Sequence, residues 1–375
     1  MRRLRGVAPL RLKPQHYAGT MADWMPDVLG DEFEQLTLPL GQDDEGEVVA
    51  TLVRALPQRS FWKRLLEGPL PLADVDVLYV HGWSDYFFQK RLARFWTSRG
   101  AHFYALDLRK YGRSLREGQT HGFVTSLTTY DEDIAAALAA IGIEVPPSDG
   151  VETTGDARPA RARRLVLLGH STGGLTLSLW ADRHRGVADA LVLNSPWLEL
   201  QVPRFARETI APFVGLQARR RPLDRAPQID LGFYTRAQAE AADPLDPVEP
   251  DRHWRPEVSW DVHAGWLHAI LTGHATVDAG LAIDAPVCVL LSARSTLPTA
   301  WSDELTRTDS VLTVDNIARA ALKLGSSVTI ERIPGALHDI FLSRHDARED
   351  AYRRLDRWVA GWNAVETREI KGRPR

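Results

Sequence analysis

The stretch Arg164-Leu-Val-Leu-Leu-Gly169-His-Ser171-Thr-Gly173-Gly174 decides the fold of this chain. The run from Arg164 to Leu168 predicts a buried strand, and the residues from Gly173 to Arg183 predict an apolar helix. Between them lies G-x-S-x-G, a motif that requires a strand, a sharp turn and a helix in this order. We therefore expect Ser171 to be a nucleophile that stands above the edge of a sheet.

The glycines of this turn have a physical reason. A side chain at Gly169 or Gly173 would collide with neighbouring elements, because the backbone of the turn is strained and closely approached. The N-terminus of the helix behind Ser171 favours developing negative charge. The alternative interpretation is a glycine-rich turn whose serine does no chemistry, and the strand before and the helix after argue against it.

Buried strands alternate with helices on both sides of this turn, which predicts an α/β fold with a mostly parallel central sheet and helices on both faces. Two earlier stretches suit an antiparallel edge of the sheet. The expected strands cover residues 33–40, 47–55, 75–80, 102–108, 164–168, 187–193, 287–291 and 327–333. The expected helices cover residues 87–98, 130–141, 173–183, 315–324 and 346–362.

The domain organisation follows from the segments that interrupt this alternation. We expect an N-terminal arm over residues 1–30, a core over residues 31–196 and 286–366, and a polar tail over residues 367–375. Residues 146–162 predict a flexible loop. Residues 197–285 are too long for a simple connection and predict a mostly helical cap, or lid, inserted over the site.

Composition excludes several classes of protein. The 375 residues are 44% hydrophobic and 25% charged, which is ordinary for a soluble globular protein, and the formal net charge of -3 gives no reason to expect a nucleic-acid partner. The chain has no apolar run of about 18 residues, so no transmembrane segment is expected. Cys288 is the single cysteine and predicts core packing, and the cytoplasm is the expected compartment.

Acyl transfer needs donors that stabilise an alkoxide in the transition state. In enzymes with this nucleophile motif, one donor is the backbone N–H after the nucleophile, here Thr172, and the other follows an early strand. His81-Gly82-Trp83 follows the expected strand over residues 75–80, so we assign the second donor to the N–H of Trp83. Gly82 lets the backbone approach the substrate, and His81 is expected to hold the loop.

The base and the acid should follow Ser171 in the order acid, then histidine. His338 lies just beyond the last expected strand and is the expected general base, whereas His345 is expected on the surface. Three aspartates follow the strand over residues 287–291 and compete for the role of the acid: Asp303, Asp309 and Asp315. We favour Asp309, because Asp303 lies in a polar stretch and Asp315 is expected to be the N-cap of a helix.

Together these pieces resemble the monoacylglycerol lipase and lysophospholipase branch of the α/β hydrolases, of the serine aminopeptidase S33 type. The matching stretches are His81-Gly82, Ala105 to Ser114, Gly169 to Gly174, Asp309-Ser-Val-Leu and Leu337-His338-Asp339. The resemblance implies the α/β-hydrolase fold, the triad Ser171, Asp309 and His338, and a mobile cap above it. Lipases of this branch commonly carry His-Gly-x-Gly, and here Trp83-Ser84 replaces the small residue and the second glycine.

The sequence therefore predicts a serine hydrolase that cleaves a carboxylic ester in a small, lipid-like substrate without a cofactor or a metal. Lysophospholipase, monoacylglycerol lipase and carboxylesterase activities are all compatible with it. The residues expected to contact substrate are Gly82, Trp83, His170, Trp260 and Trp266. Rival interpretations are an amidase or peptidase with the same triad, an acyltransferase, and a ligand-binding homologue without turnover. The oligomeric state is left open.

Overall fold

Nine strands form a single sheet in this computed structural model, which describes residues 23–57, 70–146, 163–200, 213–227, 230–244 and 246–372. The order across the sheet is β1-β2-β3-β5-β4-β6-β7-β8-β9. The strands are β1 (Met25–Pro26), β2 (Phe33–Asp43), β3 (Gly46–Ala55), β4 (Val75–Val80), β5 (His102–Asp107), β6 (Arg164–His170), β7 (Ala190–Asn194), β8 (Val287–Ser292) and β9 (Val328–Ile333). The first three neighbouring pairs in this order, from β1 to β5, are antiparallel, and the remaining five, from β5 to β9, are parallel, as expected.

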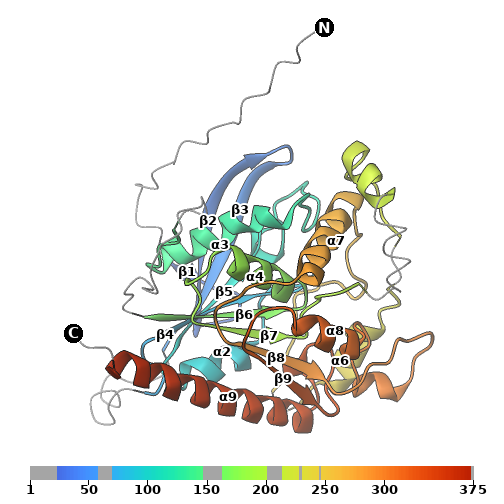
Figure 1. The fold of residues 1–375 in the computed structure, drawn as a ribbon. Helices are drawn as coiled ribbons and strands as arrows, with labels where there is room; N and C mark the ends of the chain where they lie inside the picture. The colour runs from blue at the N-terminus through green and yellow to red at the C-terminus, as the bar shows by residue number, and fades with distance from the viewer. Residues whose placement is uncertain are drawn as a thin grey trace.

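Helices cover both faces of the sheet, which confirms the predicted fold class (Figure 1). The helices are α2 (Lys90–Thr97), α3 (Tyr130–Ala140), α4 (Thr172–Arg183), α6 (Phe233–Ala241), α7 (Ala264–Ala279), α8 (Val314–Ala321) and α9 (His345–Gly372). One buried apolar cluster joins α3, α4, α7 and α8 to one face of the sheet, and a second joins α2 and α9 to the other face. The central strands β4, β6 and β7 are buried throughout, as continuous apolar runs between two layers of helices require.

Both ends of the described chain contain regular structure. Residues 1–22 of the expected arm lie outside the described residues, whereas Met25–Pro26 pairs with β2, and Asp27 is buried against Arg113 at 2.6 Å. Within the expected polar tail, α9 continues as far as Gly372, through residues that are mostly good helix formers, and Pro374 comes only later. The arm and the tail as separate segments stay predictions.

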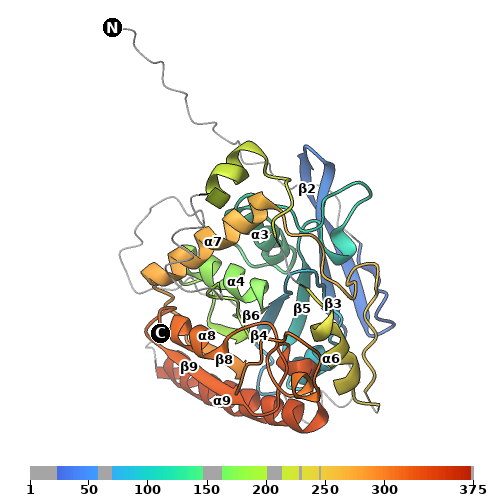
Figure 2. The same cartoon turned by 90° about the vertical axis from the view of Figure 1, so that its right-hand side faces the viewer.

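The inserted segment over residues 197–285 contains helical residues 213–220, α6 and α7, with an irregular stretch between α6 and α7. Residues 201–212 and most of the loop expected over residues 146–162 lie outside the described residues. Helix α7 runs beside α4, and its residues Trp266, Ile270 and Val277 belong to the main buried cluster (Figure 2). The part of the insertion formed by α7 thus shares the core of the sheet.

Polar residues after β5 fix the loop that carries Arg109 and Lys110. Asp107 accepts hydrogen bonds from the backbone N–H of Arg113 (3.0 Å) and pairs with its guanidinium at 2.8 Å. Arg109 pairs with Asp133 at 2.7 Å, and Lys110 pairs with two carboxylates of the β2–β3 hairpin. The charged residues of this loop therefore hold it in place next to β4 and β5.

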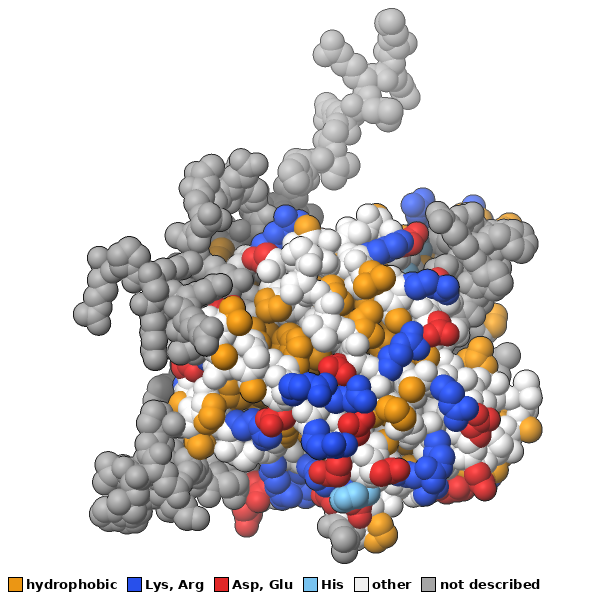
Figure 3. Space-filling view, turned by 60° about the horizontal axis from the view of Figure 1, so that its bottom comes forward, with side chains coloured by type: hydrophobic (Ala, Val, Ile, Leu, Met, Phe, Trp, Pro, Cys, Tyr) orange, Lys and Arg blue, Asp and Glu red, His pale blue; other side chains and the backbone are white. Residues whose placement is uncertain are grey.

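The outer face of the molecule along α9 carries charges of both signs (Figure 3). Arg354 pairs with Asp350 and with Glu331 of β9, and Arg99 pairs with Asp356. Cys288 is buried in β8, and burial raises the pKa of its thiol well above the ordinary value, in keeping with core packing. In the part of the chain that the structure describes, no helix combines the length and the apolar character that crossing a bilayer would need.

Candidate active site

Ser171 occupies a strained turn between β6 and α4. Its φ of 52° and ψ of -116° lie where side chains rarely stand, and such strain persists only where the surroundings enforce it. A Cβ on Gly173 would lie 2.3 Å from the carbonyl oxygens of Val80 and His81, and one on Gly169 would lie 2.7 Å from the backbone of Gly174. Gly173 is therefore required because the turn presses against the end of β4, and Gly169 because the turn folds back against the start of α4.

The structure brings Ser171, His338 and Asp309 together from three loops. His338 Nε2 lies 3.0 Å from Ser171 Oγ, and His338 Nδ1 lies 3.0 Å from Asp309 Oδ2. Ser171 follows β6, His338 follows β9, and Asp309 lies between β8 and α8, so all three stand beyond the carboxyl ends of parallel strands. Only 8% of Ser171 is exposed, and Asp309 is fully buried.

Asp309 is oriented by the backbone around it. Its second oxygen, Oδ1, accepts hydrogen bonds from the N–H groups of Val311 and Leu312, both at 2.8 Å. The competing aspartates lie elsewhere: Asp303 is exposed at the start of a short 3-10 helix, and Asp315 is exposed and pairs with Arg332 at 2.7 Å. The expectation that Asp315 caps its helix is wrong, because α8 begins one residue earlier and its N-cap is Thr313.

Two backbone N–H groups near Ser171 are free to bind an oxyanion. Neither the N–H of Trp83 nor that of Thr172 donates a hydrogen bond to another described residue. Thr172 begins α4, so its N–H belongs to the positive end of a helix. A Cβ on Gly82 would lie 3.1 Å from the Cβ of Ser171, which explains the glycine at this position.

His81 holds the loop that carries Trp83, as the sequence predicted. Its Nε2 accepts a hydrogen bond from the N–H of Leu108 at 3.1 Å, so its Nδ1 donates to the carbonyl of Gly82 at 2.8 Å. Both ring nitrogens are thus used by the backbone, and the ring is almost fully buried. Burial lowers the pKa of His81, which keeps the ring in this neutral form.

The tryptophans expected near the substrate are divided between two places. The ring centroids of Trp83 and Trp266 lie 4.0 Å apart, and Trp266 lines a small cavity that Gly82 and Thr172 also line. Trp260 is not among the residues that line this cavity, and it stacks on His121 at 3.4 Å instead. His345, at the start of α9, is exposed as expected.

His170 does not line the cavity either, and its ring lies next to that of His338. Its ring centroid is 5.1 Å from that of His338, and its Nδ1 is 3.5 Å from Asp85 Oδ2. Burial by itself would lower the pKa of His170, but the carboxylates of Asp339 and Asp85 outweigh it and raise the pKa. The imidazole next to His338 therefore binds a proton more readily than an ordinary histidine does.

Contacts between the inserted segment and the loop after Trp83 were not foreseen from the sequence. Ser84 Oγ accepts a hydrogen bond from the N–H of Trp260 at 3.2 Å, and Tyr86 Oη accepts one from the N–H of Asp251 at 2.7 Å. Between them, Asp85 pairs with Arg255 at 2.9 Å, and both side chains are buried. Residues 251–260 thus hold three consecutive residues of this loop. One of the three, Ser84, has a positive φ of 52°.

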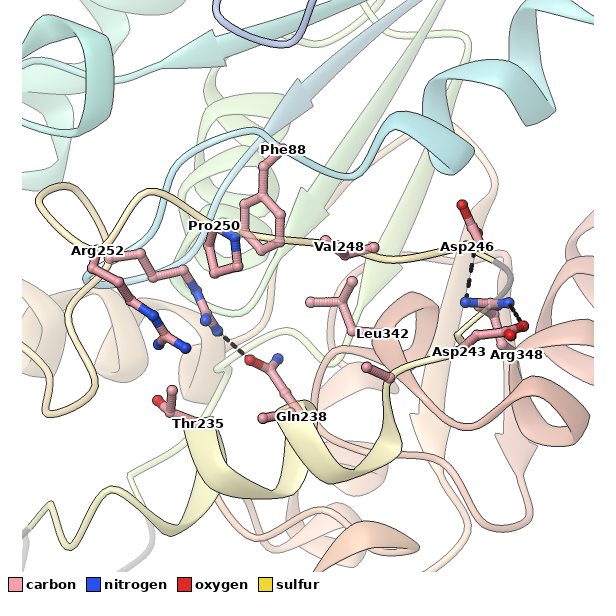
Figure 4. A pocket seen from close by; sticks show the side chains of 13 residues that line it. Phe88, Thr235, Gln238, Asp243, Asp246, Val248, Pro250, Arg252, Leu342 and Arg348 are labelled. Atoms are coloured by element: carbon pink, nitrogen blue, oxygen red, sulfur yellow. Dashed lines mark hydrogen bonds and ion pairs between the residues drawn. The ribbon is translucent and has the colours of Figure 1, made fainter.

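The Asp85–Arg255 pair stays ionised inside the protein. Burial by itself would raise the pKa of Asp85, but Arg255 and His170 outweigh it and lower the pKa. On its other side, Arg255 donates to Gln238 Oε1 at 2.6 Å and lines a groove beside α6, which also carries Gln238 (Figure 4). Neither Ser171 nor His338 lines this groove or the smaller cavity, but the smaller cavity is lined by Gly82 and Thr172, which lie at the two free N–H groups.

We expect Arg255 to position the loop over residues 81–86, which carries the N–H of Trp83. Arg255→Met should lower kcat for ester hydrolysis by about 10- to 100-fold with little change in KM, because the N–H of Trp83 loses its fixed direction. It should also lower the free energy of unfolding by about 3–5 kcal/mol, because Asp85 is left buried without its partner. Steady-state kinetics and urea unfolding measure both effects.

Two further variants separate positioning from a general loss of fold. Arg255→Lys keeps the charge, and Asp85→Asn combined with Arg255→Met removes the unpaired carboxylate, so each should recover part of kcat. Arg225→Met is the matched control, because Arg225 pairs with Asp261 on the same segment but both side chains are exposed. A folded Arg255→Met protein with the kcat of the wild type would contradict this role.

In the described residues, no group of three or more histidine, cysteine, aspartate or glutamate side chains is arranged to hold a metal ion. The candidate site contains a hydroxyl, an imidazole, a carboxylate and two free N–H groups. Such a set can form and stabilise a tetrahedral intermediate at an acyl carbon.

Comparison with known proteins places the sequence in a family. The sequence model of the family described as serine aminopeptidase, S33 matches residues 73–344, which include all three members of the arrangement. No curated protein matches the sequence.

Solved structures with similar folds include lipases and an esterase. A monoacylglycerol lipase from Paleococcus ferrophilus is 18% identical, with a TM-score of 0.55 over 76% of this chain and 94% of that chain. A soluble variant of monoglyceride lipase from Saccharomyces cerevisiae is 15% identical, with a TM-score of 0.57 over 94% of this chain and 100% of that chain. A carboxyl esterase from Bacillus coagulans is 13% identical, with a TM-score of 0.57 over 89% of this chain and 100% of that chain. At these identities the likeness is one of fold.

Proposed function

This chain belongs to the serine aminopeptidase S33 family and has the α/β-hydrolase fold, and from that premise we propose that it cleaves carboxylic esters through an acyl-enzyme on Ser171. The observation that carries the proposal is the continuous chain of contacts from Asp309 through His338 to Ser171, with 3.0 Å at each step. The lipase and esterase activities named for the similar structures agree with an ester substrate.

The reaction follows from the roles that the geometry allows. His338 takes the proton of Ser171 as the serine oxygen attacks the ester carbonyl, and Asp309 holds the imidazole and supports its positive charge. The N–H groups of Trp83 and Thr172 bind the oxyanion. His338 then protonates the leaving alcohol, and a water activated by the same imidazole releases the acid from Ser171.

An aminopeptidase is the main alternative, because the same triad cleaves amides. Such an enzyme must hold the ammonium group of its substrate next to the scissile carbonyl, and a buried cation requires a charged partner. No residue that lines the cavity beside Gly82 and Thr172, within the described part of the chain, carries a carboxylate. This absence of a partner favours an uncharged acyl group and therefore an ester over an aminoacyl substrate.

A fluorophosphonate probe tests the proposal directly. The native protein should be labelled once, peptide mapping by mass spectrometry should locate the label on Ser171, and heat-unfolded protein should stay unlabelled. The native protein should also hydrolyse p-nitrophenyl butyrate while leaving the matching p-nitroanilide and aminoacyl anilides intact. A well-folded protein that takes no label would remove the serine-hydrolase mechanism. Comparable cleavage of the anilides would replace the esterase by an amidase.

A further inference from the structure

A tyrosine of the inserted segment lies against the candidate base. Tyr234 belongs to α6, and its ring centroid is 5.6 Å from that of His338, with the two ring planes at 74° to each other. Its hydroxyl accepts a hydrogen bond from the backbone N–H of Asp339, the residue directly after His338, at 3.2 Å. We propose that Tyr234 positions His338 for catalysis, an inference that rests on the proposed role of His338 as the general base.

The loop that carries His338 depends on side chains for its position. The two N–H groups that follow His338 along the chain are bonded by side chains and not by a strand or a helix. The N–H of Ile340 donates to Asn194 Oδ1, at the end of β7, at 3.1 Å, and the N–H of Asp339 donates to Tyr234 Oη. The first partner belongs to the sheet and the second to the inserted segment, so α6 supplies a hydrogen bond that the core does not.

The side chain of Asp339 fastens the same loop to the core. Its Oδ1 accepts a hydrogen bond from Asn194 Nδ2 at 2.8 Å, its Oδ2 accepts one from Gln89 Nε2 at 3.0 Å, and the residue is buried. The carboxylate is therefore held by the core while the backbone N–H is held by α6. The peptide group between His338 and Asp339 cannot turn without breaking one of these contacts, so removing the tyrosine hydroxyl frees one side of it.

The hydroxyl of Tyr234 is itself fixed. Gln238, one turn further along α6, donates from Nε2 to Tyr234 Oη at 2.6 Å, and the orientation of this amide follows because its Oε1 accepts from Arg255 at 2.6 Å. The phenol oxygen accepts two hydrogen bonds, which uses both of its acceptor sites. Burial raises the pKa of Tyr234 well above its ordinary value, so the hydroxyl stays neutral up to alkaline pH. A neutral, immobilised acceptor therefore faces the N–H of Asp339.

Arg255 links this tyrosine to the other half of the site. The arginine pairs at 2.9 Å with Asp85, in the loop that carries one of the two free N–H groups, and it reaches Tyr234 through Gln238. One hydrogen-bonded chain of the inserted segment therefore contacts both that loop and the loop of His338. The inserted segment is in this way part of the support of the catalytic groups.

The imidazole of His338 has little tolerance for displacement. It must accept a proton from Ser171 and keep its bond to Asp309, and both contacts measure 3.0 Å. A shift of the loop changes at least one of these two distances. Because misplacement of a reacting group by about 1 Å can cost about 100-fold in rate, a smaller displacement predicts a smaller but measurable loss.

Tyr234→Phe tests the inference on the full-length protein, because it removes one oxygen atom and keeps the ring against His338. We expect kcat and kcat/KM for p-nitrophenyl butyrate to fall together by about three- to thirtyfold, with KM within about twofold of the wild type, because the lost contact positions the base and does not bind substrate. The rate at which a fluorophosphonate labels Ser171 should fall by the same factor, since that step also needs His338.

Tyr352→Phe is the matched control. Tyr352 is buried and lies close to the same loop, with its ring centroid 5.0 Å from that of Phe341, but its hydroxyl makes no hydrogen bond to another described residue. We expect wild-type kinetics for this variant. Proton NMR gives a second readout: the downfield signal of His338 Nδ1–H, assigned by its absence from His338→Gln, should shift or broaden in Tyr234→Phe and stay in place in Tyr352→Phe.

The outcomes separate this inference from the proposed function. A folded Tyr234→Phe protein with the kcat, labelling rate and NMR signal of the wild type would overturn the positioning role. So would a raised KM at unchanged kcat, which would make Tyr234 a substrate contact, or an equal loss of kcat in Tyr352→Phe. In each of these cases the wild type is still labelled at Ser171, and ester hydrolysis stands. A wild type without label or hydrolysis would remove the proposed function itself, and this inference with it.

Discussion

Replacing Ser171 by alanine is expected to lower kcat for ester hydrolysis by about 10⁴- to 10⁶-fold, since the bond-forming oxygen is removed and only binding and the oxyanion donors remain. The fold should be kept, because alanine has the same Cβ at the positive φ of 52° and the hydroxyl is bonded only to His338. Hydrolysis of p-nitrophenyl butyrate and thermal unfolding measure activity and fold together.

Ser195→Ala is the matched control for this variant. Ser195 is also buried, also has a positive φ, at 44°, and follows the neighbouring strand β7. Its hydroxyl makes no hydrogen bond to another described residue, and it is not part of the contact chain through His338. We expect nearly unchanged kinetics for Ser195→Ala. Substantial activity in a pure, folded Ser171→Ala protein would show that Ser171 is not the nucleophile.

The second large effect is expected at Asp309, where asparagine should lower kcat by about 10⁴-fold at neutral pH. The amide oxygen would accept the N–H groups of Val311 and Leu312, as Oδ1 does now, and the amide NH₂ would then point at His338 Nδ1. That arrangement forces the proton of the imidazole onto Nε2, which can then no longer accept the proton of Ser171.

The other two aspartates after β8 provide the controls for Asp309→Asn. Asp303 and Asp315 are exposed, so Asp303→Asn and Asp315→Asn should leave kcat within about twofold of the wild type. Circular dichroism and the melting temperature should be close to those of the wild type for all three variants. If Asp303→Asn or Asp315→Asn gave the large loss instead, the assignment of the acid would be wrong.

Much of the fold was predictable because the signals are local. Apolar runs predicted β4 to β9, and the errors at their ends amount to a few residues, for example at β7, which begins at Ala190 and was expected from residue 187. The end of α9 was less predictable, since polar residues suit a helix and a frayed tail equally well. The pairing of Met25–Pro26 with β2 depends on the buried Asp27–Arg113 contact, which joins residues far apart in the chain.

The residues of the candidate site also divide into those that a local sequence signal predicted and those that it did not. Ser171 and His338 were predicted from a glycine-rich turn and from a position just past the last strand, and both signals lie within a few residues of the side chain. Trp260 shows the limit of such signals: its sequence position is compatible with the substrate, yet its ring stacks on His121. Asp85 and Arg255 carried no signal, because one charged residue in a loop and one in an insertion are ordinary when taken singly.

The sequence alone determined that a strained serine turn joins a buried strand to a helix in a mostly parallel sheet, because steric demands on glycine and the periodicity of apolar residues act over short distances. Only the tertiary structure decided which of three aspartates reaches His338, which residue of the inserted segment pairs with Asp85, and which tryptophan of that segment packs against Trp83. These choices depend on how segments distant in the chain pack together, and no local pattern encodes that packing.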